Sequence, residues 1–482
     1  MILGFGRAVL PAAPAEYFGI HVIDEATGRG VPLISLTTTN RITLVTDSAG
    51  WIAFNEPGLM DREVFFTVEG SPGYSFPKDG FGFAGLRLTP KAGASAEIKV
   101  KRENIAERLY RVTGQGIYRD STLLGKGTPL PRPNLNADVM GQDSVQVVPY
   151  RGRLFWLWGD TPRPNYPLGN FHCTCAWSDL PGKGGLDPAE GVSLDYITNE
   201  QGQVRKMAPT EAPGVVWVFG VLTVTDAGKK EHLLGHYGRF KDLGTCLEHG
   251  FAEYDDELGR FLLRPQEDKE LGWQHPEGNA VRVTEEKGDY FYFSNAFPVA
   301  RVPANYESLQ DPKAYEALAW SEDQKDYVWQ KEKPPVTQAS EALAVAAMPA
   351  GKARFQVKDA ATGDRVSIHH SSVNWNAYRK CWIMIAVQHM SKISLLGEVW
   401  YAEAASPIGP WTKAVKIATH PRYSFYNPRH HPFFDQQGGR LIYFEGTYTE
   451  TFSGNPVPTP RYDYNQIMYR LDLDDPRLEA AR

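Results

Sequence analysis

The feature that most constrains the fold is a repeated pattern of short, aromatic-rich β runs over the last three quarters of the chain. Residues 154–158, 215–219 and 382–386 are examples, and turn residues bound each of them. Runs this short suit strands better than helices, and helical periodicity is confined to residues 312–320 and 340–348. With aromatic residues at 12% and 45 Gly and 35 Pro in the chain, the pattern predicts an all-β protein.

Five groups of these runs follow one another after residue 120. Each group spans about seventy residues and contains enough β runs for a four-stranded sheet, which is the content of one propeller blade. The pattern therefore predicts a five-bladed β-propeller over residues 120–482. The β-rich stretches of the five groups are 144–158, 215–261, 280–293, 371–402 and 430–471.

The first hundred residues predict a separate β-sandwich over residues 16–102, because short alternating strands recur there between turns. The spacing Asp24-x-x-Thr27-Gly28, with Thr46-Asp47-x-x-Gly50 further on, resembles the carboxypeptidase-regulatory-like domains of the immunoglobulin or transthyretin type. That resemblance implies an accessory module of an exported bacterial protein, secreted or periplasmic. Residues 1–15 form a short, weakly signal-like N-terminal segment. Residues 103–119 are predicted to be a linker.

Charge and motifs exclude several functions. The net charge of −6 gives no basic field for nucleic acid, so no nucleic-acid partner is expected. No apolar run approaches the roughly 20 residues that a membrane-spanning helix needs. The chain contains no Gly-x-Ser-x-Gly elbow, Walker loop or dinucleotide fingerprint. The four cysteines lack zinc-site spacing, and a disulfide among them is not predictable.

Two aspartates of the first group carry the clearest chemical pattern. Asp143 stands just before the run that would form an innermost strand, and Asp160 ends the next run, seventeen residues later. A hairpin would return Asp160 to the end of the sheet where Asp143 lies. Two neighbouring carboxyl groups, one ionised and one protonated, are what glycoside hydrolysis requires. An ordinary turn-capping role for Asp160 is the alternative.

The motifs Gly141-x-Asp143-Ser144 and Trp158-Gly159-Asp160-Thr161 resemble those of the five-bladed propeller glycoside hydrolases. The resemblance is greatest to the domain-of-unknown-function 4185 group, and it is weaker to the arabinanase-like propellers. It implies that Asp143 and Asp160 are the catalytic pair and that Trp411 packs between blades. The arabinanase-like propellers place a third acid on a middle blade.

The third acid cannot be aligned uniquely. Glu277 is favoured because it lies in a polar segment just before a predicted inner strand. The other candidates are Glu211, Glu248 and Glu398.

Further polar and aromatic residues are candidates for binding the substrate. Arginine could hold an acidic sugar through a two-pronged contact, and histidines at the start of an inner strand could face the central channel. The substrate-binding candidates are Arg239, His275, Trp375, Asn427, His430 and His431. No metal ligand set and no cofactor are predicted, although a channel-centred cation such as calcium, bound near His431 or near His369 and His370, is left open.

The sequence thus predicts a glycoside hydrolase that acts on a poly- or oligosaccharide, its carbohydrate substrate, with Asp143, Asp160 and Glu277 as the catalytic acids. Two alternatives stay open at this point. One is a polysaccharide lyase that uses His431, Tyr426 and Arg239, and the other is a propeller that binds glycans without cleaving them.

Overall fold

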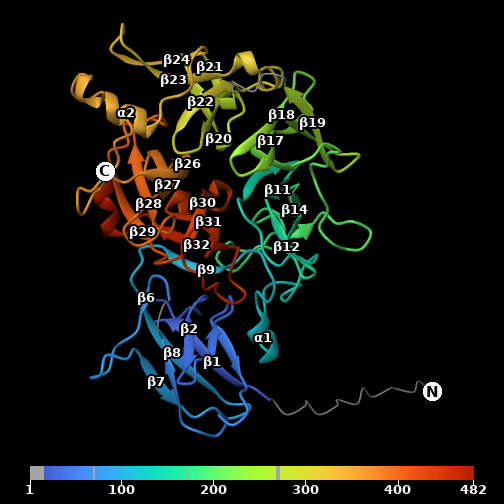
Figure 1. Ribbon diagram of the computed structural model, residues 1–482, viewed down its shortest axis with the longest axis vertical. Coiled ribbons are helices and arrows are strands. Elements are labelled where there is room, and N and C mark those ends of the chain that lie inside the picture. Colours follow the sequence, from blue (N-terminus) through green and yellow to red (C-terminus); the bar gives the residue numbers. More distant parts are fainter. Residues whose placement is uncertain (1–15, 69–70, 171, 267–271) are drawn as a thin grey trace. The chain divides into compact units, whose positions relative to one another are not determined.

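The computed structural model describes residues 16–68, 71–170, 172–266 and 272–482, so the predicted N-terminal segment 1–15 lies outside the described residues. The all-β prediction is confirmed, because strands dominate and only two short α-helices occur among these residues (Figure 1). The chain divides into two compact units. The first holds the described residues up to Ser71 together with Ser75–Lys101 and Tyr118–Thr128, and the second holds Pro72–Tyr74, Arg102–Ile117 and Pro129–Arg482.

The first unit is built from two four-stranded sheets, of which only the strand-end residues Tyr74 and Arg102 are counted with the second unit. Phe54 of one sheet contacts Phe66 of the other edge to face, with ring centres 5.3 Å apart. Helix α1 (Arg119–Leu123) belongs to this unit, where Asp47 Oδ2 accepts the Ser121 N–H at 2.6 Å and Asp120 Oδ1 accepts the Ala53 N–H at 2.9 Å. In order, the sheets are β4 (Trp51–Phe54), β1 (Phe18–Asp24), β8 (Ser95–Arg102) and β6 (Tyr74–Ser75), and β3 (Thr43–Val45), β2 (Ser35–Thr38), β5 (Val64–Thr67) and β7 (Gly85–Leu88).

The second unit contains five sheets of four or five strands, which we number 1 to 5 along the chain. Sheet 1 consists of β10 (Gln146–Tyr150), β11 (Arg153–Trp158), β14 (Thr174–Ser178) and β15 (Asp195–Tyr196), and sheet 2 of β16 (Val215–Thr225), β17 (Glu231–Asp242), β18 (Thr245–Asp255) and β19 (Arg260–Gln266). Sheet 3 consists of β20 (Asn279–Glu285), β21 (Gly288–Ser294), β22 (Pro298–Pro303), β23 (Glu316–Ser321) and β24 (Asp326–Gln330). Sheet 4 has the order β25 (Lys358–Asp359), β29 (Lys413–Ala418), β28 (Val399–Ala404), β27 (Cys381–Gln388) and β26 (Ile368–Asn376). Sheet 5 has the order β30 (Ser424–His430), β31 (Leu441–Thr449), β32 (Asn465–Asp472) and β9 (Glu107–Arg111). The small hairpin β12 (Thr161–Arg163) and β13 (Tyr166–Asn170) and helix α2 (Gln338–Ala344) lie outside these sheets.

The inner strands β10, β16, β20, β26 and β30 are neighbours in chain order, since each contacts the next. Strand β30 is also hydrogen-bonded back toward β10, because Arg429 Nη2 donates to the Val147 carbonyl oxygen at 2.9 Å. The outermost strand of sheet 5 is β9, which comes from the N-terminal side of the unit. The last sheet is therefore completed by a strand that precedes the first sheet in sequence.

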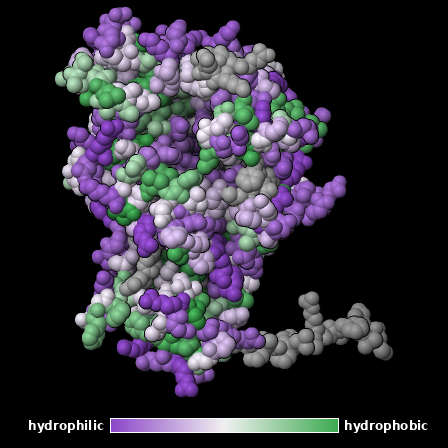
Figure 2. All heavy atoms as spheres, in the orientation of Figure 1, coloured by the Kyte–Doolittle hydropathy of each residue, from purple (hydrophilic) through white to green (hydrophobic). Residues whose placement is uncertain are grey.

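Apolar and aromatic side chains fill the spaces between neighbouring sheets. Phe155 of sheet 1 and Tyr237 of sheet 2 belong to one buried cluster, and Trp411 lies fully buried in another cluster with Leu318 of sheet 3 and Met384 of sheet 4. Trp411 thus packs between sheets, as the sequence predicted. On the face shown in Figure 2, hydrophilic residues predominate and the hydrophobic ones form small, scattered patches. No described helix is long and apolar enough to span a membrane.

Candidate active site

The β10–β11 hairpin brings Asp143 and Asp160 together. Asp143 precedes β10 and Asp160 follows β11, and the two strands pair with Gln146 opposite Leu157. The Asp160 N–H donates to Asp143 Oδ1 at 2.9 Å, and the Gly159 N–H donates to the Asp143 carbonyl oxygen at 3.0 Å. A Cβ at position 159 would lie 2.5 Å from Asp143 Oδ1, so only glycine allows this close approach.

The two carboxyl groups differ in the donors around them. Asp143 Oδ2 accepts the Tyr426 hydroxyl at 3.0 Å, and Ser144 and Tyr464 also hydrogen-bond to this carboxyl. Burial raises the pKa of Asp143, and these hydrogen bonds oppose the rise. Asp160 accepts a hydrogen bond from Trp217 Nε1 at 2.9 Å, and burial together with the negative charge of Asp143 raises its pKa to about 7. Because more donors stabilise a negative charge on Asp143, the pair holds its proton on Asp160 near neutral pH.

A cavity of about 1420 Å³ opens beside this pair. Of the predicted catalytic and substrate-binding residues, Asp143, Asp160, Glu277 and Asn427 line it. Tyr426, His369 and His370, which the sequence suggested for the lyase or for a cation, line it as well. Glu277 stands two residues before β20 of sheet 3, and its side chain is exposed at the cavity. Desolvation by the surrounding protein raises its pKa. All five sheets contribute to the wall, through residues at or near the beginning of their inner strands: Gln146, Val215, Asn279, His370 and Asn427.

Sequence reasoning missed several residues of the cavity wall. Glu450 directly follows β31, as Asp160 follows β11, and the Glu450 N–H donates to Asp463 Oδ1 at 2.8 Å. Burial and the neighbouring Glu450 raise the pKa of Asp463 to about 7. The position of an acid directly after the second strand of a sheet was a readable signal for Glu450. Trp217 and Tyr464 carry no comparable pattern.

Left-handed backbone conformations gather at the cavity. Ser144 and Asn427 have φ values of 56° and 50°, and Asn427 Nδ2 donates to Ser144 Oγ at 2.8 Å. Phe452, Arg461 and Tyr464 also line the cavity with φ values of 62°, 64° and 60°. Non-glycine residues are uncommon in this region of φ, and such strain gathers at functional sites.

Four of the predicted substrate-binding residues are held by other partners and do not line the cavity. Arg239 Nη2 donates to Glu248 Oε2 at 3.0 Å, and Nη1 donates to the Pro213 carbonyl oxygen at 2.6 Å. His275 is buried beside Phe251, and burial lowers its pKa to about 4. His430 hydrogen-bonds to Asp435 and His431 to Glu445, at 2.8 and 2.7 Å.

Trp375 also lies away from the cavity. It stands near the end of β26, whereas His370 at the beginning of the same strand lines the cavity. Its side chain is 49% exposed and contacts Trp382 edge to face. Among the other third-acid candidates, Glu248 pairs with Arg239, Glu398 is buried against Lys416 and Thr419, and Glu211 is exposed.

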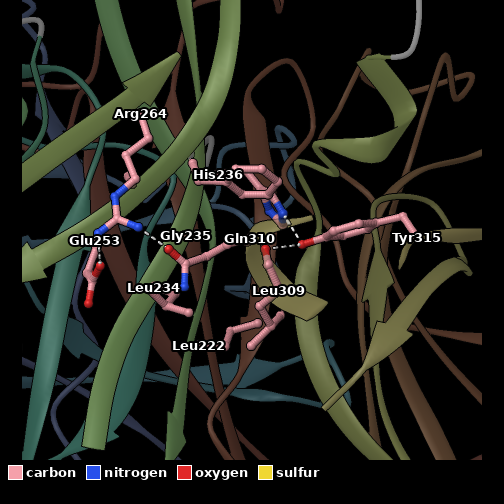
Figure 3. Close-up of a pocket in the computed structure, with 12 residues that line it drawn as sticks. Leu222, Leu234, Gly235, His236, Glu253, Arg264, Leu309, Gln310 and Tyr315 are labelled. Carbon is pink, nitrogen blue, oxygen red and sulfur yellow. Dashed lines mark hydrogen bonds and ion pairs between the residues drawn. The ribbon is translucent and has the colours of Figure 1, made fainter. Parts of the chain in front are cut away.

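A second, much smaller cavity lies between sheet 2 and residues 309–315, which connect β22 to β23 (Figure 3). Its volume is about 10 Å³, the size of a single water molecule, so it cannot admit a sugar. His236 Nε2 hydrogen-bonds there to the Tyr315 hydroxyl at 2.7 Å, and Arg264 pairs with Glu253.

No group of three or more histidine, cysteine, aspartate and glutamate residues is arranged to bind a metal ion within the described parts of the chain. All four cysteines are free thiols.

Comparison with known proteins finds only distant structural similarity. No protein-family model and no curated protein matches the sequence. A GH43_1 enzyme from Xanthomonas citri complexed with xylotriose is similar with a TM-score of 0.36 and 12% identity, over 70% of this chain and 87% of that chain. An exo-1,5-α-L-arabinanase from a bovine ruminal metagenomic library gives 0.34 and 10%, over 70% and 94%. A family 117 glycoside hydrolase from Zobellia galactanivorans gives 0.34 and 11%, over 77% and 93%. These neighbours are glycoside hydrolases, but similarity this low does not establish shared chemistry.

Proposed function

We propose that this protein is a five-bladed β-propeller glycoside hydrolase that cleaves a poly- or oligosaccharide in the large cavity. The observation that carries the proposal is the Asp143–Asp160 pair, in which one carboxyl is surrounded by donors and the other has a pKa raised to about 7. A hydrolase of this kind needs a carboxylate that acts as the base and a protonated carboxyl that donates to the leaving oxygen. Asp143 of the pair is proposed as the base, and Glu277 of the same cavity as the acid. The pair opens on a cavity to which all five sheets contribute.

In the proposed reaction, the Asp143 carboxylate removes a proton from water as the water oxygen attacks the anomeric carbon. The bond between that carbon and the glycosidic oxygen breaks, and the departing oxygen takes a proton from Glu277. Glu277 is assigned as the acid because it borders the cavity beside sheet 3, whereas Asp143 borders it beside sheet 1, and because desolvation raises its pKa. Asp160 keeps its proton and limits the negative charge beside the base. Direct attack by water inverts the anomeric configuration.

The two alternative functions have less support. The lyase predicted from the sequence would use Arg239 and His431, yet both lie outside the cavity, Arg239 paired with Glu248 and His431 with Glu445. A purely glycan-binding propeller would not need the Asp143–Asp160 pair and Glu277 to border one cavity, whereas hydrolysis uses a base and an acid there. The immunoglobulin-like assignment of residues 16–102 and the export of the protein both stay predictions.

The deciding experiment treats a panel of polysaccharides with the purified protein and measures new reducing ends. We expect reducing ends from at least one neutral glycan, without the ultraviolet absorbance that a lyase product would show. Asp143→Asn on the same glycan serves as the matched control and should release none. Binding of a glycan without cleavage by the wild type would contradict the proposal.

A further inference from the structure

A network of buried polar groups joins the inner strands of the second unit. Arg429, on β30, is 7% exposed, and its guanidinium donates to the side-chain oxygen of Asn279 on β20 and to the Val147 carbonyl oxygen on β10. Asn279 Nδ2 in turn donates to the Ser371 carbonyl oxygen on β26 at 2.9 Å. One arginine and one asparagine thus connect four of the five sheets.

Gln146 connects the remaining sheet to this network. Its Oε1 accepts the Val221 N–H at 2.9 Å, and its Nε2 donates to the Val218 carbonyl oxygen at 3.4 Å. Gln146 belongs to β10 and both of its partners belong to β16. Three side chains therefore link all five inner strands, and only that of Arg429 carries a permanent charge.

The charge on Arg429 lies among groups that do not cancel it fully. Glu445 stands directly opposite Arg429 in the β30–β31 pairing, but burial raises the Glu445 pKa to about 8. Burial lowers the pKa of Arg429 only to about 10, so the guanidinium stays charged near neutral pH. His431 and His370 are both held neutral, since burial and the nearby Arg429 lower their pKa values.

The channel-centred cation that the sequence left open does not fit these surroundings. Calcium binds through carboxylate and carbonyl oxygens. The carbonyl oxygens of Asn279 and Val147 already accept hydrogen bonds from Arg429. The nearby carboxyl of Glu445 hydrogen-bonds to His431 and has a pKa raised to about 8, so it carries little negative charge near neutral pH. A metal ion would also have to approach a buried positive charge, which is unfavourable at short range.

We propose that Arg429 is the resident cation of this ring of strands, and that its guanidinium makes the contacts between sheets for which a bound metal ion would otherwise be needed. The ring should then hold together without any metal. This inference concerns the assembly of the sheets and does not depend on the proposed hydrolase reaction.

The first test uses the wild-type protein, whose metal content is measured by elemental analysis after purification without chelators. Its apparent Tm is then compared in EDTA and in calcium chloride. We expect no stoichiometric metal and the same Tm in both solutions. Stoichiometric calcium, or a Tm that falls in EDTA and recovers with calcium, would overturn the proposal.

The second test removes the guanidinium and returns it as a free ion. Arg429→Ala should lower the apparent Tm by at least ~5 °C, because two buried acceptors lose a charged donor. Guanidinium chloride well below denaturing concentrations should restore part of the loss, and sodium chloride at equal ionic strength should not. Arg239→Ala is the control, since Arg239 is paired outside the ring centre and its variant should not gain from guanidinium.

Each outcome of the second test decides for or against the proposal. An Arg429→Ala variant as stable as the wild type would overturn the proposal, and so would rescue by calcium in place of guanidinium. If this variant does not fold, Arg429→Lys keeps the charge and should fold with a Tm below that of the wild type. A lysine variant as stable as the wild type would show that the two-pronged contact is not needed and would also overturn the proposal.

Discussion

The cavity wall and the buried polar groups around Arg429, which we call the centre, use the same residue types in different ways. At the wall, Asp143 and Asp160 share one edge of a hairpin and border a large open space. At the centre, His431 and Glu445 are fully buried and hydrogen-bonded to each other at 2.7 Å. The pKa values of Asp160 and Glu445 are both raised, to about 7 and about 8. A perturbed pKa therefore marks a buried carboxyl, and only access to the cavity makes it a candidate for catalysis.

The largest expected effect is the loss of activity on changing Asp143 at the cavity wall. Asp143→Asn should reduce kcat on the cleaved glycan by about 10³-fold or more, because the amide cannot accept the proton from water. The fold should survive, since an amide oxygen can still accept the Asp160 N–H. The measurement is the initial rate of reducing-end release together with the Tm.

Glu445→Gln is the partner variant at the centre. It should lower the Tm while the activity per folded molecule stays close to that of the wild type. A loss of kcat in Glu445→Gln as large as that in Asp143→Asn would show that the division between wall and centre is wrong.

Glu277→Gln tests the second carboxyl of the wall. The variant should lose about 10²-fold or more in kcat on a natural glycan, because the leaving oxygen no longer receives a proton. A substrate whose leaving group needs no protonation, such as a nitrophenyl glycoside, should be cleaved at nearly the wild-type rate. Asp143→Asn should be inactive on both substrates, because the base is needed for both. Equal losses of Glu277→Gln on both substrates would remove Glu277 from the role of the acid.

Gly159→Ala displaces the base without changing its chemistry. The new methyl group would lie 2.5 Å from Asp143 Oδ1, so the carboxylate must move. A displacement of this kind should lower kcat by about 10- to 100-fold while KM changes little. Steady-state kinetics measure both constants. Gly152→Ala, at a turn where a Cβ would meet nothing within 4 Å, is the control for glycine loss in the same hairpin. Gly152 has a left-handed φ of 79°, which Gly159 lacks, so this control adds backbone strain and should affect the Tm alone.

The proton on Asp160 predicts a pH dependence of stability. An unfolded aspartate loses its proton near pH 4, whereas the folded one retains it up to about pH 7. Between these values the native state binds more protons than the unfolded state, so rising pH lowers the free energy of unfolding. Asp160→Asn lacks this penalty and should be more stable than the wild type at pH 8, by at most about 4 kcal/mol, and not at pH 4. Denaturant unfolding at the two pH values measures the difference. A gap that is larger at pH 4 would reverse the assigned direction of the pKa.

The sequence could predict the part of the site that local chain geometry determines. Asp143 and Asp160 are brought together by a hairpin whose two runs and turn are visible in the sequence, and Glu277 could be placed because it precedes an inner strand. Tyr426 and Asp143 are 283 positions apart, and their contact depends on how sheet 5 returns to sheet 1. His430 and His431 show the opposite failure. They stand at the end of an inner strand and not at its beginning, and they are bound by Asp435 and Glu445, whose positions no local pattern reveals.

The smallest expected effect concerns Arg239, which lies outside both the cavity wall and the centre. Arg239 has the chemistry to bind an acidic sugar, but its guanidinium is occupied by Glu248 and by the Pro213 carbonyl oxygen. Arg239→Gln should leave kcat/KM within about twofold of the wild type, since a partly exposed ion pair contributes little beyond local stability. The assay uses the glycan that gives the largest rate. A loss of tenfold or more, carried by KM, would mean that substrate reaches the end of sheet 2 that holds Arg239. The cavity described by the five inner strands would then be only part of the binding surface, because its wall stops short of that pair.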